Sequence, residues 1–417
     1  MTTTAEQQRV GGALSGWMAS TKQALDRPLT SYYLLVGAST LLVTIGLMMV
    51  LSSSSVYSFK EHGNSYHIFL KQLMWVGLAL PVAFIASRMP SRVLRWLAWP
   101  GLIVATVLIY LTQTSLGVRV NGNTNWLELG PLMLQPSEIA KLAMVLWAAD
   151  LYARKEKVLH DWKHALIPMV PVTGLMTALV VRGGDLGTAL VLFAIILGML
   201  WVVGAPARLF IGSLMTVGVI ALYLASTSAE RRERLTNFVD PFNDYQDAGW
   251  QAAHGLFAMS SGGWFGKGIS ASQQKWGSLP EAHTDFIFAV LGEELGLVGT
   301  LLVLVLFLTI AYAGVRVALR TEDAFTRYMC AGIIIWLMSQ MMINIGMVLV
   351  LLPVIGIPLP LVSYGGSALL PSLVALGLLI SLARSEPGAR AALHARRRRR
   401  MAGVTTGSAL ARRGKSR

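Results

Sequence analysis

Charge is scarce in this chain. Only 13% of its 417 residues are Asp, Glu, Lys or Arg, whereas 54% are hydrophobic and the mean hydropathy is +0.58. Soluble globular domains carry about 25% charged residues, so this composition excludes an ordinary soluble fold. Cysteine is scarcer still, because Cys330 is the only one, and this excludes an intrachain disulfide. The composition is typical of a polytopic membrane protein.

The N-terminal segment also lacks the apolar core of a cleavable signal peptide. Residues 1–28 are polar, so the first membrane span is expected to act as an uncleaved anchor.

Long apolar runs fill the rest of the chain. A spanning helix needs about 17–25 predominantly apolar residues. Ten segments approach that length: Tyr32–Ser53, Phe69–Ser87, Val93–Leu111, Ser137–Tyr152, Ala165–Val181, Gly187–Val203, Ala207–Ser226, Phe286–Ala311, Arg327–Leu352 and Ala368–Ala383. We therefore expect an all-α polytopic membrane protein of about ten transmembrane helices over residues 31–385. Residues 1–30 and 386–417 are expected to be disordered arms.

Basic residues predict the orientation of these spans. Lys and Arg concentrate in the short loops of one face, which are expected to be cytoplasmic together with both termini. The residues concerned are Arg88, Arg92, Arg154, Lys155, Lys157, Lys163, Arg208, Arg316, Arg320 and Arg327. The basic tail Ala395–Gly403 then faces the anionic inner leaflet, so membrane lipid, and not nucleic acid, is its expected partner.

One predicted outer loop, over residues 227–284 between the seventh and eighth spans, is much longer than an ordinary connection. It is rich in Trp, Phe and Gly, whereas disordered segments have few aromatic residues. We expect a partly helical loop lying on the outer leaflet.

Unusual polar segments interrupt the apolar pattern, and all of them fall on the outer face of the predicted topology. They are "VNGNTNWLELGPLMLQPSEIAK", "RGGDLGTAL", the end of the long loop at Asp285, and "MINIGMVLVLLPVIGIPLPLVSYGGSALL". Scattered structural polar residues would divide between the two faces. Their clustering predicts one extracytoplasmic site.

The amino-acid sequences of these segments resemble those of a known protein family. "LPEAHTDFIFAVLGEELG", "QPSEIAK" and "INIGMVLVLLPVIGIPLPLVSYGGS" resemble the FtsW/RodA/SpoVE (SEDS) family of bacterial peptidoglycan glycosyltransferases, and the resemblance runs from about Ser31 to Ala383. Asn121–Gly122 and the intact "LPEAHTDFIF" look more like the division member of that family than its elongation member. The chain departs from the family pattern at Asn125, where the family usually has Arg, and at Gly184, where it usually has Pro.

The resemblance implies a function. It indicates inverting polymerisation of lipid II into glycan strands, with undecaprenyl pyrophosphate as the leaving group, in the plasma membrane at the division septum. It further implies a class B penicillin-binding protein as transpeptidase partner, with other divisome proteins. Alternatives are a lipid II flippase, a RodA-like elongation polymerase, and a divisome scaffold without chemistry.

Asp285 is the residue expected to do the chemistry. The family's essential aspartate maps onto it, and a carboxylate is needed to take the proton of an attacking sugar hydroxyl. The alternative is an N-cap of the helix that follows, since Asp before an apolar run is a standard start signal. Asp185 could be a helix cap or, with Asp285, a ligand of Mg²⁺ accompanying the pyrophosphate.

Other polar residues have predicted supporting roles. Glu293 lies about 12 Å along the helix from Asp285, so neither it nor Glu294 can share a proton with Asp285; at least one of the two is expected to face an inner cavity. Glu138 and Lys141 are expected to pair across a helical turn, unless Lys141 forms the floor of the site. Gln340 and Asn344 share a helix face and suit interhelical hydrogen bonds.

The remaining predicted site residues contact substrate. The cations of the long loop are expected to bind pyrophosphate, unless they are solvated, and the polar residues around the Pro- and Gly-rich segment are expected to line the cavity. These residues are Arg231, Arg234, Lys267, Lys275, His283, Ser363, Tyr364 and Ser367, with Trp126 in a supporting position.

Overall fold

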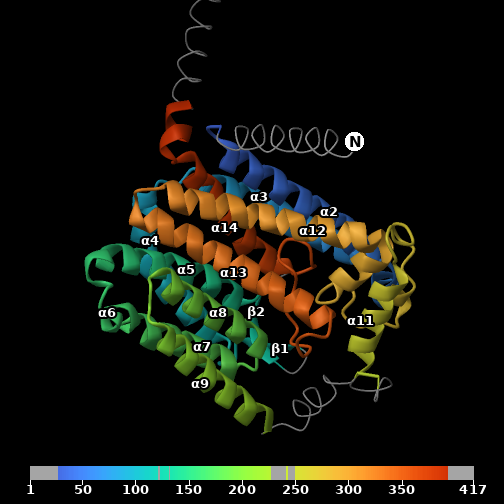
Figure 1. The fold of residues 1–417 in the computed structure, drawn as a ribbon. Helices are drawn as coiled ribbons and strands as arrows, with labels where there is room; N and C mark the ends of the chain where they lie inside the picture. The colour runs from blue at the N-terminus through green and yellow to red at the C-terminus, as the bar shows by residue number, and fades with distance from the viewer. Residues whose placement is uncertain (1–26, 121–122, 131, 227–240, 243–248, 393–417) are drawn as a thin grey trace, which may run out of the picture.

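Figure 1 shows a helical bundle in the computed structural model, which describes residues 27–120, 123–130, 132–226, 241–242 and 249–392. Its principal helices are α2 (Thr30–His62), α3 (His67–Ala86), α4 (Ser91–Leu111), α5 (Pro136–Lys155), α6 (Trp162–Leu166), α7 (Met169–Arg182), α8 (Leu186–Val202), α9 (Ala207–Ser226), α11 (Trp250–Ser261), α12 (Ile287–Arg320), α13 (Ala324–Val348) and α14 (Leu369–Arg384). Short 3-10 turns lie at Glu156–Val158, Gln274–Trp276 and Gly366–Ala368.

Seven of the described helical segments are long and apolar enough to cross a membrane. They are α2, α3, α4, the segment Trp162–Arg182, α12, α13 and the segment Gly366–Arg384. Two shorter apolar helices lie at Leu186–Val202 and Ala207–Thr216, and α5 carries Glu138, Lys141 and Asp150 in its interior. Every predicted span thus overlaps a helix and the polytopic fold is confirmed, while the number of ten crossings stays a prediction.

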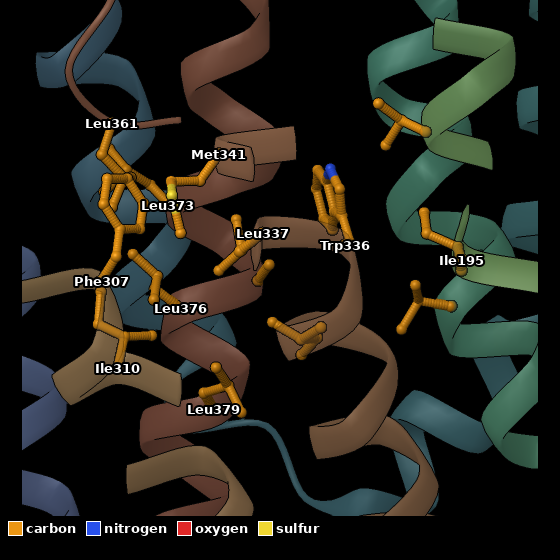
Figure 2. Close-up of a cluster of buried hydrophobic side chains, with 14 of the residues drawn as sticks. Ile195, Phe307, Ile310, Trp336, Leu337, Met341, Leu361, Leu373, Leu376 and Leu379 are labelled. Carbon is orange, nitrogen blue, oxygen red and sulfur yellow. The ribbon is translucent and has the colours of Figure 1, made fainter. Parts of the chain in front are cut away.

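Apolar side chains fill the centre of the bundle because α12, α13 and α14 pack against one another. Figure 2 shows Phe307 and Ile310 of α12, Trp336 of α13 and Leu373 of α14 among this buried cluster. Around it, α12 packs against α2, α14 against α3, and α5 against α4 and α13.

A small antiparallel sheet, in the order β1-β2-β3, lies beside the helices and was not predicted from the sequence. Its strands are β1 (Gly117–Val120), β2 (Asn123–Leu129) and β3 (Leu132–Leu134), with Val118 opposite Trp126 and Leu127 opposite Leu134. Alternating side chains give the sheet one face toward the bundle. Strands β2 and β3 come from the polar segment that follows Val120, and the sheet lies at one end of the bundle (Figure 1).

Regular helical geometry is broken at two places, in α12 and in the chain between α13 and α14. Helix α12 contains Gly296 at φ 66 and ψ −165, which no regular helix permits. The chain between α13 and α14 is irregular, as its Pro and Gly residues predict, and it contains the positive φ angles of Val350, Gly356 and Leu361. Both breaks leave backbone groups that other segments must satisfy.

Candidate functional site

Asp285 lies in a tight turn that leads into α12. Phe286 N–H and Thr284 N–H both donate to the carbonyl of Glu281, at 3.1 and 3.2 Å. Helix α12 begins at Ile287, and its N-terminus has no side-chain cap. The N-cap alternative for Asp285 is therefore wrong, and its carboxylate has no part in starting the helix.

The irregular segment after α13 is held against this turn. Asn344 of α13 donates from Nδ2 to the carbonyl of Asp285 at 2.8 Å and to that of Ile357 at 2.7 Å. Gly356 lies beside the carboxylate, where an added Cβ would stand 3.3 Å from Asp285 Oδ2, and its φ is +78. The amide predicted to join helices therefore fixes the backbone of Asp285.

The carboxylate of Asp285 is partly exposed, and within the described ranges it accepts no hydrogen bond and forms no ion pair with a cation. Burial under the surrounding protein, followed by the negative charges of Glu281 and Asp185, raises the pKa of Asp285 to about 7. At neutral pH both its protonated and its ionised forms are populated. A group in that state can accept a proton at little cost.

Three aromatic rings pack together around His283, two residues before Asp285. His283 stacks on Tyr57 of α2, with ring centroids 5.2 Å apart, and meets Tyr364 at 5.7 Å. Tyr364 N–H donates to the carbonyl of His283 at 2.9 Å. Burial lowers the pKa of His283, against the opposing charge of Glu281, so the imidazole is neutral near pH 7. The predicted contact of His283 and Tyr364 with substrate stays a prediction.

Asp185 is a second polar centre, at the start of α8. Its carboxylate accepts from Thr188 N–H at 2.8 Å, from Thr188 Oγ1 at 2.8 Å, from Gln135 Nε2 at 2.9 Å and from Asn125 Nδ2 at 3.0 Å. The capping prediction for Asp185 is confirmed. Gly184 before it has φ +89, which Pro cannot adopt, so Gly fits this turn.

The magnesium site predicted at Asp185 and Asp285 stays a prediction. Three of the four donors converge on Oδ2 of Asp185, whereas Oδ1 accepts only the N–H of Thr188 among the described residues. Over the part of the chain that the structure describes, no group of three or more His, Cys, Asp or Glu side chains is placed to hold a metal ion.

Lys141 is buried at the centre of a third polar group. Its Nζ donates to Glu138 Oε1 and to Gln340 Oε1, both at 2.8 Å, and lies over the ring of Trp336. Gln340 in turn donates to the carbonyl of Pro358 at 3.0 Å. The predicted ion pair between Glu138 and Lys141 forms within α5. Through Gln340, Lys141 also links α5 to α13 and to the irregular segment.

Glu293 and Glu294 both point into the long loop, which corrects the expectation that one of them faces an inner cavity. Glu293 Oε1 pairs with Lys267 Nζ at 2.8 Å, and its Oε2 accepts from Ser272 Oγ at 2.6 Å. Glu294 Oε1 pairs with Lys275 Nζ at 3.1 Å. These carboxylates fasten the loop to α12.

Three substrate-binding predictions are corrected. Lys275 is 3% exposed, because its ammonium group is enclosed by Glu294, Ser52 and the carbonyl of Ser270. Ser363 and Ser367 are buried, and their hydroxyl oxygens accept backbone bonds from Leu359 N–H at 2.8 Å and Gln135 N–H at 3.0 Å. A cation or hydroxyl that is already bonded inside the protein is not available to line a cavity.

Of the other residues predicted to contact or support substrate, Lys267 and Trp126 lie in the part of the chain that the structure describes. Lys267 keeps 29% of its side chain exposed beside Glu293, and Trp126 lies half-buried in β2. Arg231 and Arg234 fall outside the described residues.

Sequence reasoning missed several partners of the site. Gln135 and Asn125 reach Asp185, and Ser52 of α2 donates to Glu294 Oε2 at 2.8 Å. The polar run "SSSS" at Ser52–Ser55, inside an otherwise apolar span, was the signal that could have indicated a buried polar contact there.

Comparison with known proteins finds relatives over most of the chain. The family model FTSW_RODA_SPOVE, described as "Cell cycle protein", matches residues 32–387. "Probable peptidoglycan glycosyltransferase FtsW" of Mycobacterium tuberculosis is 41% identical over 374 residues, which cover 89% of this chain and 71% of that protein. "Stage V sporulation protein E" of Bacillus subtilis is 35% identical over 84% of this chain and 96% of its own length.

Solved structures agree with these matches. The crystal structure of the Rod shape determining protein RodA of Thermus thermophilus superimposes with a TM-score of 0.63 at 28% identity, covering 85% of this chain and 97% of that one. A chain from "Structural coordination of polymerization and crosslinking by a peptidoglycan synthase complex" gives a TM-score of 0.69 at 28% identity, with the same coverage.

Proposed function

Because this chain belongs to the FtsW/RodA/SpoVE family of cell cycle proteins, we propose that it polymerises lipid II with Asp285 as the general base. It is a multi-pass membrane protein and a peptidoglycan glycosyltransferase, as relatives up to 41% identical are named. The similarity to FtsW proteins supports a role in cell division.

The proposed reaction joins two sugars. The Asp285 carboxylate accepts the proton of the 4-hydroxyl of the acceptor sugar as that oxygen attacks the anomeric carbon of the donor. The bond from this carbon to the pyrophosphate oxygen breaks, and undecaprenyl pyrophosphate departs with the electron pair. Attack opposite to the leaving group inverts the anomeric centre. A leaving group whose charge is already delocalised over phosphates needs no acid of its own, so one base suffices.

The observation that carries this proposal is the contrast of Asp285 with the other carboxylates of the site. Its carboxylate has solvent contact, a pKa raised to about 7, and no cation beside it within the described residues. Its main chain is fixed by Asn344. A base held in place by its backbone, with its side chain free, can meet a substrate hydroxyl without breaking another bond.

The orientation of the site belongs to the same proposal. The end of the bundle that carries Asp285, the sheet and α11, here called the Asp285 end, faces the extracytoplasmic side, and both termini face the cytoplasm. The distribution of basic loop residues supports this arrangement. The site of action is the septal membrane.

A transpeptidase of class B penicillin-binding type is the proposed partner. The support is the fold shared with a chain of a peptidoglycan synthase complex that coordinates polymerisation with crosslinking. Other divisome proteins would join this pair.

A flippase would need polar groups continuing from the site to the opposite face. The interior between α12, α13 and α14 is instead filled by apolar side chains such as Phe307, Leu337 and Leu376 (Figure 2). This packing favours chemistry at one end of the bundle over a polar path through it.

Polymerisation of purified lipid II tests the proposal. Native protein and the Asp285→Asn variant are compared in nanodiscs, each with and without the cognate transpeptidase. We expect the variant to lose at least about 10²-fold in rate, the usual contribution of a general base. Glu128→Gln, which removes an exposed carboxylate of β2, is the matched control and should retain activity.

Equal rates for native protein and Asp285→Asn would refute the assignment of the base. If native protein with its partner polymerises nothing, transport of lipid II across vesicles becomes the measurement to make, and the polymerase proposal fails.

A further inference from the structure

The loop over residues 262–277, here called the aromatic loop, is bonded to α12 at its break. The loop and the helix exchange four backbone hydrogen bonds of 2.9–3.1 Å. These bonds run from Lys267 to Glu293, from Gly268 to Glu294, from Leu297 to Gly263 and from Val298 to Trp264. A Cβ on Gly296 or Gly266 would collide with backbone atoms, so glycine is what permits this close approach. These bonds therefore hold the aromatic loop at one position along the axis of α12.

The exposure of side chains along α12 indicates where the hydrocarbon region of the membrane begins. From Ile287 to Glu294 every residue of the helix is buried. From Leu297 onward it exposes a large apolar side chain on every turn as far as Leu319. At 1.5 Å per residue this lipid-facing stripe is about 33 Å long, close to the ~30 Å hydrocarbon core of a bilayer. The hydrocarbon boundary at the Asp285 end thus falls at Leu297.

Trp264 and Phe265 stand at that boundary. The carbonyl of Trp264 accepts the N–H of Val298, the second residue of the stripe. The two side chains are 70% and 82% exposed, so they contact little of the protein. Trp and other aromatic side chains are enriched at this depth because their rings suit the region between headgroups and acyl chains.

Charge beneath these rings is neutralised. Lys267 and Lys275 are paired with Glu293 and Glu294, so the aromatic loop presents no uncompensated ammonium from these positions to the lipid. An exposed apolar surface that continues the lipid-facing stripe of α12, on a rigid backbone, suits a membrane more closely than a soluble partner.

We propose that Trp264 and Phe265 form an interfacial anchor that inserts into the outermost lipid layer at the Asp285 end of the bundle. The anchor fixes how far α12 projects above the hydrocarbon. Asp285 and Ile287 precede the break at Gly296 and lie outside the lipid-facing stripe, as a site for a sugar joined to the membrane through a pyrophosphate requires. The inference depends on the membrane-spanning fold and not on the catalytic role of Asp285.

Site-specific fluorescence tests the anchor. Cys330 is buried and is replaced by Ala, and single cysteines are placed at Phe265, at Glu281 in the exposed turn, and at Leu308 in the middle of the stripe. Each protein is labelled with the fluorophore NBD and reconstituted in nanodiscs of phosphatidylcholine and phosphatidylglycerol. Quenching is measured with aqueous iodide and with lipids brominated on their acyl chains.

We expect the probe at position 265 to be quenched by iodide several-fold less than the probe at 281, and by brominated lipid less than the probe at 308. Iodide quenching equal to that at 281 would overturn the anchor. Protection from iodide that arises only when the transpeptidase is added would also overturn it, and would assign the surface to a protein partner. Trp264→Cys repeats the measurement at the neighbouring position, so that the result does not depend on one variant.

Discussion

Asp285 and the pair Glu293 and Glu294 lie on one short stretch of chain, yet the fold treats their charges in opposite ways. Each glutamate meets a lysine of the aromatic loop, and further hydroxyl or backbone donors surround it. Asp285 has no cation beside it among the described residues, and burial, followed by the negative charges of Glu281 and Asp185, raises its pKa to about 7. The glutamates stabilise the loop, whereas the carboxylate of Asp285 has no such partner among the described residues, as its proposed role as a base requires.

This difference shows what distinguishes a structural carboxylate from a reactive one. A paired, buried carboxylate holds its geometry because its removal leaves another charge uncompensated. A carboxylate without a cation costs stability, and a fold retains such a group where the chemistry needs it. Substitutions in the two groups should therefore change stability in opposite directions.

The largest effect is expected at Lys275. Replacing it by Met leaves the carboxylate of Glu294 buried against Ser52 without a cation. Breaking a buried ion pair in this way costs about 3–5 kcal/mol. Thermal unfolding in detergent should show a large fall in Tm. The double variant Lys275→Met/Glu294→Gln should recover much of that loss, and a double variant as unstable as the single one would show that Lys275 acts through packing alone.

A substitution at Asp285 is expected to increase the stability of the protein, whereas the substitution at Lys275 decreases it. A carboxyl whose native pKa is raised to about 7 binds its proton more tightly in the folded state, so its contribution to stability is greatest at low pH and is lost as the pH rises through 7. Asp285→Asn should therefore stabilise the protein at pH 8 by about 1–3 kcal/mol, less than the full shift because the carboxylate is partly exposed. The gain should shrink as the pH approaches 4. A variant less stable than native protein at pH 8 would contradict this.

The same pKa predicts how the rate depends on pH. Only the ionised carboxylate accepts a proton, so polymerisation should fall as the pH decreases through about 7, approaching tenfold per unit below it. Glu281→Gln removes one of the negative neighbours and should move this midpoint to lower pH. The measurement is the initial rate on lipid II between pH 5.5 and 9, a range chosen to bracket the midpoint. A midpoint that Glu281→Gln leaves in place would exclude its charge as a cause.

The sequence predicted those features that local spacing or motif wording determines. Glu138 and Lys141 pair because they are one turn apart on α5. Asp285 was proposed as the base from the motif that surrounds it. The partners of Glu294 could not be found in this way, because Ser52 and Lys275 reach it from distant segments. The sheet was missed because its strands are short and lie between two apolar spans, where turn chemistry and not hydrophobic periodicity decides the structure.

The smallest effect is expected at Lys267, and it separates two roles. Lys267→Met leaves Glu293 with Ser272 Oγ and the N–H of Gln273 as donors, and the lysine is 29% exposed, so the stability loss should be about 1 kcal/mol. If Lys267 also contacts the pyrophosphate, the KM for lipid II should rise while kcat changes little, because a substrate contact present throughout the reaction adds uniform binding. Lys267→Arg keeps the charge and should restore KM. A variant with native KM and slightly lower Tm would show that Lys267 only fastens the aromatic loop to α12, as Lys275 does.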